Sequence, residues 1–262
     1  MIRKKFIQPR EHPSRSSRLL GSTSSGTKWI FPDNIPSEYD WVSDEVLGTP
    51  SKVSLSYLEK LKEAKVVIRT SEEGKYELVV PNIEERICYS NRSLETESNW
   101  LWVLDTFFTK VGGKISFSNF QIEILQECKC APSQLHPNSW SIIRSFELVC
   151  DFLGFQLSSK VFFYLFKLTI QKMFNGRTFL SFRAFPGCRI FSLFEDSYHD
   201  FKEMYFKIRP LPGVTLFYLG VEKKKRFHIY WNYNASSSRP SLDDLMKMVG
   251  GLEAVAAMRR RL

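Results

Sequence analysis

The chain enters its longest amphipathic helix through the stretch Ala131-Pro132-Ser133-Gln134-Leu135-His136-Pro137-Asn138-Ser139-Trp140. The two prolines disfavour helix in the residues that precede them, so residues 129–138 are predicted to form a loop. Asn138 or Ser139 is suited to cap the helix, and Leu135 and Trp140 are suited to pack across its start as a hydrophobic staple. Apolar residues then recur at three-four spacing up to Gly154, at Ile142, Ile143, Phe146, Val149, Cys150 and Leu153. We therefore predict a helix from residue 138 or 139 to residue 155 and a structural role for Gln134 to Trp140.

Upstream of this stretch the pattern predicts three more helices and two short strands. Leu55, Leu58, Leu61 and Ala64 indicate a helix over residues 54–65, followed by short strands at residues 66–68 and 76–80. The apolar residues from Trp100 to Phe108 indicate an amphipathic helix that ends at Gly112-Gly113. A further helix, capped by Ser116 or Ser118, is predicted to carry Phe120, Ile122, Leu125 and Cys128.

Downstream the periodicity changes. Residues 161–168 fit either a buried strand or a short core helix, because a short apolar run has no distinguishing period. Residues 178–183 are predicted to form a strand, with residues 189–191 as its hairpin partner. Residues 198–207 fit a helix or a strand. Residues 241–257 indicate an amphipathic helix that Gly250-Gly251 weakens.

These elements predict an α+β fold, in which a helical bundle-like N-terminal half packs with a small aromatic-rich antiparallel sheet. Residues 1–27 are rich in Arg, Lys, Ser, Pro and Gly, so we expect a disordered basic tail. The expected organisation is a mostly disordered tail and linker over residues 1–50 and a small helix-strand region over residues 51–92. The main domain, ending in a C-terminal helix, is expected over residues 93–262.

Composition excludes several classes of protein. Hydrophobic residues make up 43% and aromatic residues 15% of the 262 residues, which a disordered chain would lack. No apolar run approaches the 18 residues of a membrane span, so no membrane partner is expected. The five cysteines show no paired spacing, and no apolar segment follows the cations of the N-terminus. We therefore expect an intracellular protein, in the nucleus or the cytoplasm.

The net charge of +9 is concentrated in three places. Residues 1–30 carry seven cations against Glu11 alone, residues 223–226 carry four cations and residues 259–261 carry three. The remaining chain therefore has a net charge of −4. Such clusters attract polyanions by releasing counterions, although they also occur as simple solvated surface. The candidate nucleic-acid-binding residues are Arg3, Lys4, Lys5, Arg10, Arg15, Arg18, Lys223, Lys224, Lys225 and Arg226.

The second of these segments is followed directly by aromatic residues, as Lys223-Lys224-Lys225-Arg226-Phe227-His228-Ile229-Tyr230-Trp231. Cations beside aromatic rings can hold phosphates while the rings stack on bases. The same letters also fit a basic turn that precedes a core strand. Both interpretations stay open from the sequence.

No catalytic, metal or cofactor site emerges from the motifs. Cys128, Cys130 and His136 supply three soft ligands, but a zinc site needs a fourth ligand and a wider cysteine spacing. His199 lies among acidic residues that fit a helix start as well as an acid–base site. Neither glycine pair has the pattern of a nucleotide-binding loop. The enzymatic alternative is a metal-dependent polynucleotidyl transferase, which would gather three carboxylates from Asp105, Asp151, Glu195, Asp196 and Asp200.

The stretch Gln134 to Trp140, with the helix that follows, resembles the gypsy-type transposase domain of plant transposable elements. The order of the flanking features agrees over about residues 95–240, and more weakly back to residue 53. These features are Phe107-Phe108, Val111-Gly112, Val161 to Leu168, Phe179 to Phe182, Phe201 to Ile208 and Phe227 to Trp231. One departure is Lys114-Ile115-Ser116, where the family has an arginine-proline turn.

The resemblance implies an origin in a plant retrotransposon and brings no catalytic residues with it. It implies a non-catalytic protein that binds nucleic acid or assembles with copies of itself, in the manner of a capsid precursor. The transferase remains the alternative, and a decayed element fragment without function is a third hypothesis.

Overall fold

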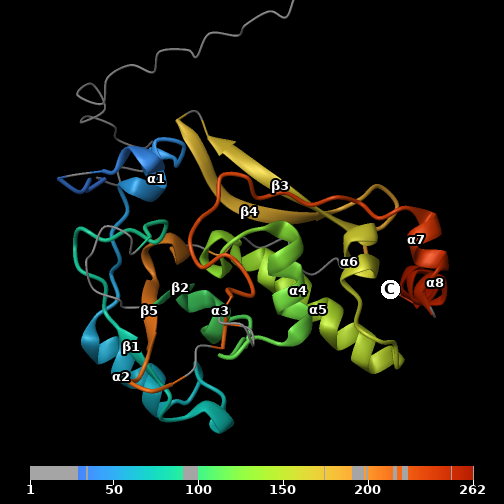
Figure 1. Ribbon diagram of the computed structural model, residues 1–262, viewed down its shortest axis with the longest axis horizontal. Coiled ribbons are helices and arrows are strands. Elements are labelled where there is room, and N and C mark those ends of the chain that lie inside the picture. Colours follow the sequence, from blue (N-terminus) through green and yellow to red (C-terminus); the bar gives the residue numbers. More distant parts are fainter. Residues whose placement is uncertain are drawn as a thin grey trace, which may run out of the picture. The chain divides into compact units, whose positions relative to one another are not determined.

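The computed structural model describes residues 29–33, 35–90, 100–173, 175–190, 198, 200–214, 217–219, 224–248 and 250–261. By their contacts, residues 31–262 group apart from residues 1–30. The elements of the described residues all belong to the larger group (Figure 1). The helices are α1 (Asp44–Leu47), α2 (Leu55–Glu63), α3 (Asp105–Thr109), α4 (Asn119–Cys128), α5 (Pro137–Leu153), α6 (Ser159–Leu165), α7 (Leu242–Met246) and α8 (Gly251–Arg261). The strands are β1 (Tyr76–Val79), β2 (Leu101–Leu104), β3 (Phe166–Met173), β4 (Gly176–Ala184) and β5 (Tyr205–Pro210).

An antiparallel sheet of order β1-β5-β2 separates two hydrophobic clusters. Leu101 and Val103 of β2 face the larger cluster, while Trp102 and Leu104 face the smaller one. Successive side chains of a strand point to opposite faces, so both faces of β2 are buried. The sheet therefore lies inside the molecule, between the two clusters. In its central strand β5, Phe206 and Ile208 likewise face the larger cluster and Tyr205 faces the smaller one.

The helix expected over Trp100 to Phe108 is wrong in its first half. The structure has β2 over residues 101–104, and only then the short helix α3. A strand that is buried on both faces is a continuous apolar run, and such a run has no period that distinguishes it from a buried helix. Residues 66–68 also differ from prediction, because only Ile68 pairs there, through a single bridge to Ile115.

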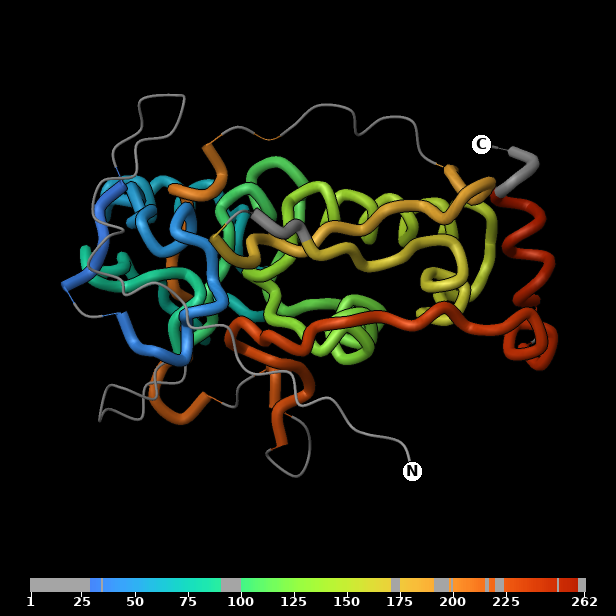
Figure 2. Tube along the Cα trace, turned by 90° about the horizontal axis from the view of Figure 1, so that it is seen from above, coloured from blue at the N-terminus to red at the C-terminus, as the bar shows by residue number. Residues whose placement is uncertain are grey.

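The segment whose type stayed open, residues 161–168, contains both alternatives. Helix α6 ends at Leu165, and β3 begins at Phe166 and pairs with β4 in an antiparallel hairpin. Figures 1 and 2 show this hairpin running alongside α5. The partner expected at residues 189–191 is therefore wrong: Arg189 and Ile190 lie outside any strand, and Phe191 lies outside the described residues. Strand β3 pairs with β4 instead, because β3 is longer than the segment 189–191 and is separated from β4 by only two residues.

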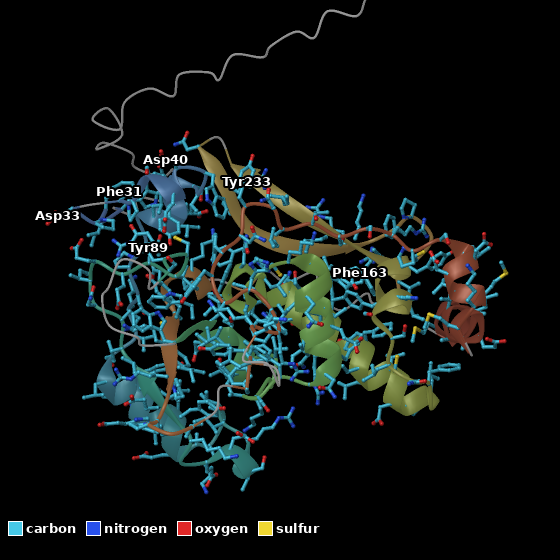
Figure 3. All side chains as sticks on the ribbon, in the orientation of Figure 1. Phe31, Asp33, Asp40, Tyr89, Phe163 and Tyr233 are labelled. Atoms are coloured by element: carbon cyan, nitrogen blue, oxygen red, sulfur yellow. The ribbon has the colours of Figure 1, made fainter. Side chains whose placement is uncertain are left out.

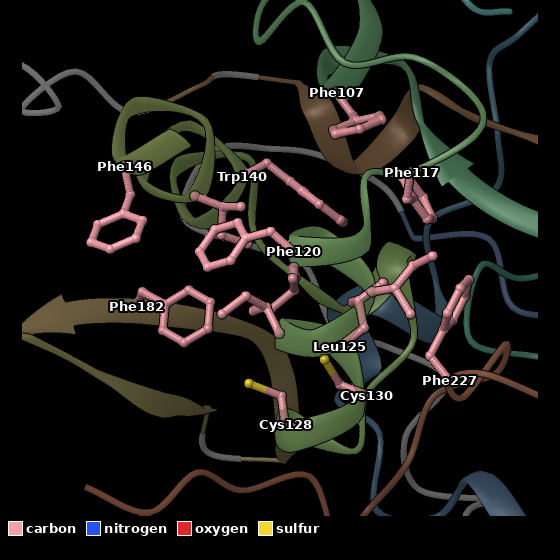
Figure 4. Close-up of a cluster of buried hydrophobic side chains, with 14 of the residues drawn as sticks. Phe107, Phe117, Phe120, Leu125, Cys128, Cys130, Trp140, Phe146, Phe182 and Phe227 are labelled. Carbon is pink, nitrogen blue, oxygen red and sulfur yellow. The ribbon is translucent and has the colours of Figure 1, made fainter. Parts of the chain in front are cut away.

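The start of helix α4 and the end of helix α5 are close to what their sequences predict. Ser118 caps α4 through a capping box with Gln121, and Gly154 ends α5 with a left-handed φ of 70°. Between these helices, Phe120 stacks on Phe146 with ring centroids 5.4 Å apart, and Phe182 of β4 joins them through Phe162. Figure 4 shows Phe120, Phe146 and Phe182 pointing toward one another. This aromatic cluster fixes the hairpin to the helices.

The ends of the described chain also pack. Val42 and Leu47, in the segment expected to be part of a tail and linker, are buried in the smaller cluster. The helix expected over residues 241–257 is divided into α7 and α8, because Gly250 takes a φ of 74° that breaks the helix. Strand β1, from the predicted region 51–92, pairs with β5 of the predicted domain 93–262, so these two regions share one sheet.

The α+β class is confirmed, with eight helices and two small antiparallel sheets in the described residues. All five cysteines lie in this part of the chain, where each is buried and none forms a disulfide. Among the described residues, no helix combines the length and apolar character needed to cross a membrane.

A buried ion pair lies on the sheet face toward the smaller cluster. The Nζ atom of Lys207 lies 2.8 Å from both carboxylate oxygens of Glu85, and it lies 4.7 Å from the ring centroid of Trp100. Both charged residues are 8% exposed. Each charge is therefore tolerated only in the presence of the other.

We predict that Glu85→Ala lowers the free energy of unfolding by about 3–5 kcal/mol, because it leaves the Lys207 ammonium buried without a counter-ion. The matched control is Glu77→Ala, which removes the ion pair with Arg209 at a more exposed position of the same sheet. That control should cost less than about 1 kcal/mol. Urea unfolding of both variants tests this, and equal losses would contradict it.

Candidate nucleic-acid interface

Gln134 fixes the segment of residues 231–233 to the centre of the molecule. It lies in a 3₁₀ turn at Pro132–Gln134 and is 2% exposed. Its Nε2 atom donates to the carbonyl of Asn232 at 3.0 Å, and its Oε1 atom accepts from the amide of Asn232 at 3.0 Å. Both polar groups of a side-chain amide are thereby satisfied by one backbone residue.

Two further hydrogen bonds hold the same segment. The indole Nε1 of Trp231 donates to Ser133 Oγ at 3.2 Å. The side-chain amide of Asn232 donates to the carbonyl of Lys129 at 2.7 Å, at the C-terminal end of α4. The chain around Trp231 is therefore located by residues about 100 positions earlier in the sequence.

The start of α5 is capped by His136, and the cap expected at Asn138 or Ser139 is wrong. Nδ1 of His136 accepts from the Asn138 amide at 3.1 Å. Pro137 at the first helical position has no N–H and has a fixed φ that suits a helix, which moves the cap two or three residues earlier than predicted. Ser139, fully buried, instead donates to Leu180 O and accepts from Phe182 N, which joins α5 to β4.

The other residues of the sequence motif are also internal. Leu135 is fully buried and forms a parallel bridge to Leu180. The indole of Trp140 donates to the Pro132 carbonyl at 3.1 Å, and its ring centroid lies 4.5 Å from that of Phe107. The side chains of the motif thus bind other parts of the same chain.

An open groove of about 670 Å³ lies beside the segment that Gln134 holds. We call it the aromatic groove. It is lined by residues before α1, at the end of α4 and from 225 to 233, among them Trp41, Lys225, Arg226, His228, Tyr230 and Tyr233. Its volume is in the range of small-molecule binding sites.

The far wall of the groove comes from an early part of the chain. The ring centroids of Trp41 and Tyr233 lie 5.6 Å apart in an edge arrangement, and the Arg177 guanidinium lies 3.6 Å from the Tyr233 centroid. Figure 3 labels Tyr233 near the first residues of β4. Gly176 permits this approach, because a Cβ atom there would lie 2.8 Å from the backbone of residues 41–43.

The groove carries positive charge along one side. Nζ of Lys225 lies 5.0 Å from the Tyr230 centroid, and Arg226 donates to Asn119 Oδ1 at 3.2 Å. Burial lowers the pKa of His228, and the positive charges of Lys225 and Lys129 lower it further. The His228 imidazole thus responds to the cations around it. Glu38 is an acidic residue on the lining.

The sequence-predicted cations separate into two sets. Lys224 and Lys225 are exposed and Arg226 is half-buried, next to the groove. Of the two open interpretations, the basic turn before a core strand is wrong in its strand, because residues 226–231 lie outside any strand. The backbone N–H of Arg226 donates to the carbonyl of Tyr218. The remaining predicted cations lie outside the described residues: Arg3, Lys4, Lys5, Arg10, Arg15, Arg18 and Lys223.

Sequence reasoning did not find four residues of this site: Trp41, Lys129, Arg177 and Tyr233. They come from four distant parts of the chain and meet only through the fold. Tyr233 alone had a signal, since it continues the alternation of large apolar residues at Phe227, Ile229 and Trp231.

In the described part of the chain, no three His, Cys, Asp or Glu side chains are placed to hold a metal ion. Cys128 and Cys130 are both fully buried, and burial raises the pKa of the Cys128 thiol. Asp105 accepts a hydrogen bond from Thr109 inside α3, and burial raises its pKa. Asp151 and Asp200 are exposed, and Glu195, Asp196 and His199 lie outside the described residues.

Residues 103–170 match a family model described as "Putative gypsy type transposon". This stretch runs from β2 to β3 and includes α4, α5 and the motif from Gln134 to Trp140. The resemblance to a gypsy-type transposase domain is confirmed here. No curated protein and no solved structure matches the chain.

His136 gives the fold a specific dependence on pH. Burial lowers its pKa to about 4, and Lys202 contributes. The unfolded state, with a pKa of about 6.5, therefore binds a proton at a higher pH than the folded state does. The contribution of neutral His136 to the stability of the folded state is therefore complete above pH 6.5 and is lost as pH falls toward 4. The free energy of unfolding is expected to fall by about 2 kcal/mol between pH 7 and pH 5 on this account.

We predict that His136→Asn, which keeps a capping side chain but does not titrate, removes about this much of the pH dependence. Urea unfolding of wild type and variant at pH 7 and pH 5 measures the difference, while the carboxylates contribute equally to both proteins. The same pH dependence in both proteins would show that His136 is not the responsible group.

Proposed function

We propose that this chain is a non-catalytic nucleic-acid-binding protein of a gypsy-type transposable element. It would contact phosphates through residues 223–226 and through the cations of residues 1–27. The observation that carries the proposal is the position of Lys225 and Arg226 at a groove lined by aromatic rings. Phosphate contacts of this kind give most of the affinity of sequence-independent binding.

The charge distribution supports the same proposal. The six cations of residues 1–27 and the four of residues 223–226 together exceed the whole net charge of +9. The rest of the chain is close to neutral or mildly acidic, so attraction to a polyanion would be directed to these segments. The family match fits this proposal, since an element's own proteins must handle its nucleic acid.

Finer points of the resemblance stay predictions. These are the plant origin, the nuclear or cytoplasmic location and the self-association of a capsid-precursor-like protein. The transferase alternative requires three carboxylates around metal ions. Of its five candidates, Asp105 is engaged within α3, while Glu195 and Asp196 lie outside the described residues.

We predict that the full chain binds nucleic acid at low salt and that binding weakens steeply as salt rises. Deleting residues 1–27 should lower the slope of log K against log salt, by up to about 5 for duplex DNA if all six of these cations contact phosphates. Fluorescence anisotropy with a labelled 30-mer across a salt series measures both slopes. Absence of binding by the full chain at low salt would refute the proposal.

A triple variant, Lys224→Gln, Lys225→Gln and Arg226→Gln, tests the groove cations separately. It should lower the slope by up to about 3 for duplex DNA and about 2 for a single strand. The matched control removes the same charge from exposed positions elsewhere, through Lys60→Gln, Lys62→Gln and Lys110→Gln. Equal effects of the two triple variants would show that net charge alone, rather than this site, determines binding.

A further inference from the structure

We infer that the aromatic groove selects single-stranded nucleic acid, by stacking unpaired bases on Tyr233 and Tyr230 while Lys225 and Arg226 hold the phosphates. This inference rests on the proposed function, and it adds the class of nucleic acid and the residues that recognise it.

Three rings of the groove reach the surface, those of Trp41, Tyr230 and Tyr233, whereas the lining rings of Tyr39, Phe227 and Trp231 are buried in the core. Tyr233 is 49% exposed, although a tyrosine of this size is usually more covered. Tyr230 and Trp41 are half-buried and line the same groove. Exposed aromatic rings beside cations are the arrangement that single-strand-binding proteins use, since every base offers a π face regardless of sequence.

The Tyr233 ring is held in a fixed position. The Arg177 guanidinium lies 3.6 Å from its centroid, and Arg177 also donates to the Tyr233 carbonyl. Trp41 contacts the same ring at its edge, and Gln134 fixes the adjacent backbone at Asn232. A ring that is already immobilised loses little entropy when a base stacks on it, so its contribution to affinity is larger.

The charges are complementary to a nucleic-acid backbone. Nζ of Lys225 lies 5.0 Å from the centroid of the Tyr230 ring, so a cation is placed directly beside a ring on which a base could stack. Lys129 and Lys225 both lie close enough to influence His228. Lys225 and Arg226 thus line the same groove as Tyr230 and Tyr233, which suits a strand in which each nucleotide carries one phosphate and one base.

A duplex cannot be recognised by base stacking in this groove. Its bases are paired and stacked on one another, so their faces are not available to protein rings, and only its phosphates remain. The groove cations would therefore act on both forms of nucleic acid, whereas the rings would act only on the single strand.

The test uses the full chain with fluorescein-labelled 20-mers of deoxythymidylate and with a 20-base-pair duplex, at one fixed salt concentration. We expect the single strand to bind about tenfold or more tightly than the duplex. Tyr233→Leu should weaken single-strand binding by roughly tenfold and leave duplex binding unchanged, and Tyr233→Phe should restore it, because the ring rather than the hydroxyl is needed.

Tyr164→Leu is the matched control, since Tyr164 also carries a guanidinium on its ring, from Arg239 at 4.5 Å, but lies outside the groove. It should leave both affinities unchanged. Thermal unfolding of each variant confirms that the fold is retained.

Failure of the proposed function and failure of strand selection give different results in this test. If the full chain binds neither probe, the proposed function itself fails. If it binds both equally, or if Tyr233→Leu weakens both equally, nucleic-acid binding stands and strand selection is overturned. If free thymidine monophosphate competes fully while Tyr233→Leu leaves the single-strand affinity unchanged, the groove is a nucleotide site and the inference is also overturned.

Discussion

The pairing of the Gln134 amide with the backbone of Asn232 is the constraint on which the arrangement of the site depends. Buried polar groups must be hydrogen-bonded, and leaving one unpaired costs about 1–3 kcal/mol. Gln134 satisfies both of its groups on a single residue about 100 positions away. Five residues further on, Ser139 satisfies the backbone of β4 at residues 180 and 182. One short stretch thereby fixes the positions of two distant segments, the one at Asn232 and the one in β4. Hydrophobic packing alone would not specify their register.

The central sheet imposes a second constraint of a different kind. It divides the interior into two clusters, so strands β2 and β5 must present apolar side chains on both faces. On the smaller side, the place of an apolar residue is taken by Lys207, with Glu85 and Trp100 around its ammonium group. This exception is tolerated because the charge is fully paired, and it fixes the register between β5 and the loop that carries Glu85.

The fold was predictable where local rules decide and not where the partner is distant. Helix α4 with its Ser118 cap and helix α5 with its Gly154 end follow from periodicity and capping residues. Strand β2 was mistaken for a helix because its two-sided burial removes the alternation. The cap of α5 was misplaced by the presence of Pro137. The basic part of the site was found from sequence because its cations are consecutive, whereas Trp41 and Arg177 are brought to Tyr233 only by the fold.

The distinction between a structural motif and a functional one does not hold for residues 131–140. The side chains of Gln134 and Ser139 hydrogen-bond to other parts of the chain, and that of Trp140 to Pro132 within the stretch, so the direct role of this stretch is structural. The segment that Ser133 and Gln134 hold is, however, the wall of the aromatic groove, and Tyr233 follows directly after the residue that Gln134 pairs with. A displacement of Asn232 would move that ring relative to Arg177 and Trp41. The motif therefore acts on recognition through geometry, and a functional contribution is expected from residues that never touch a ligand.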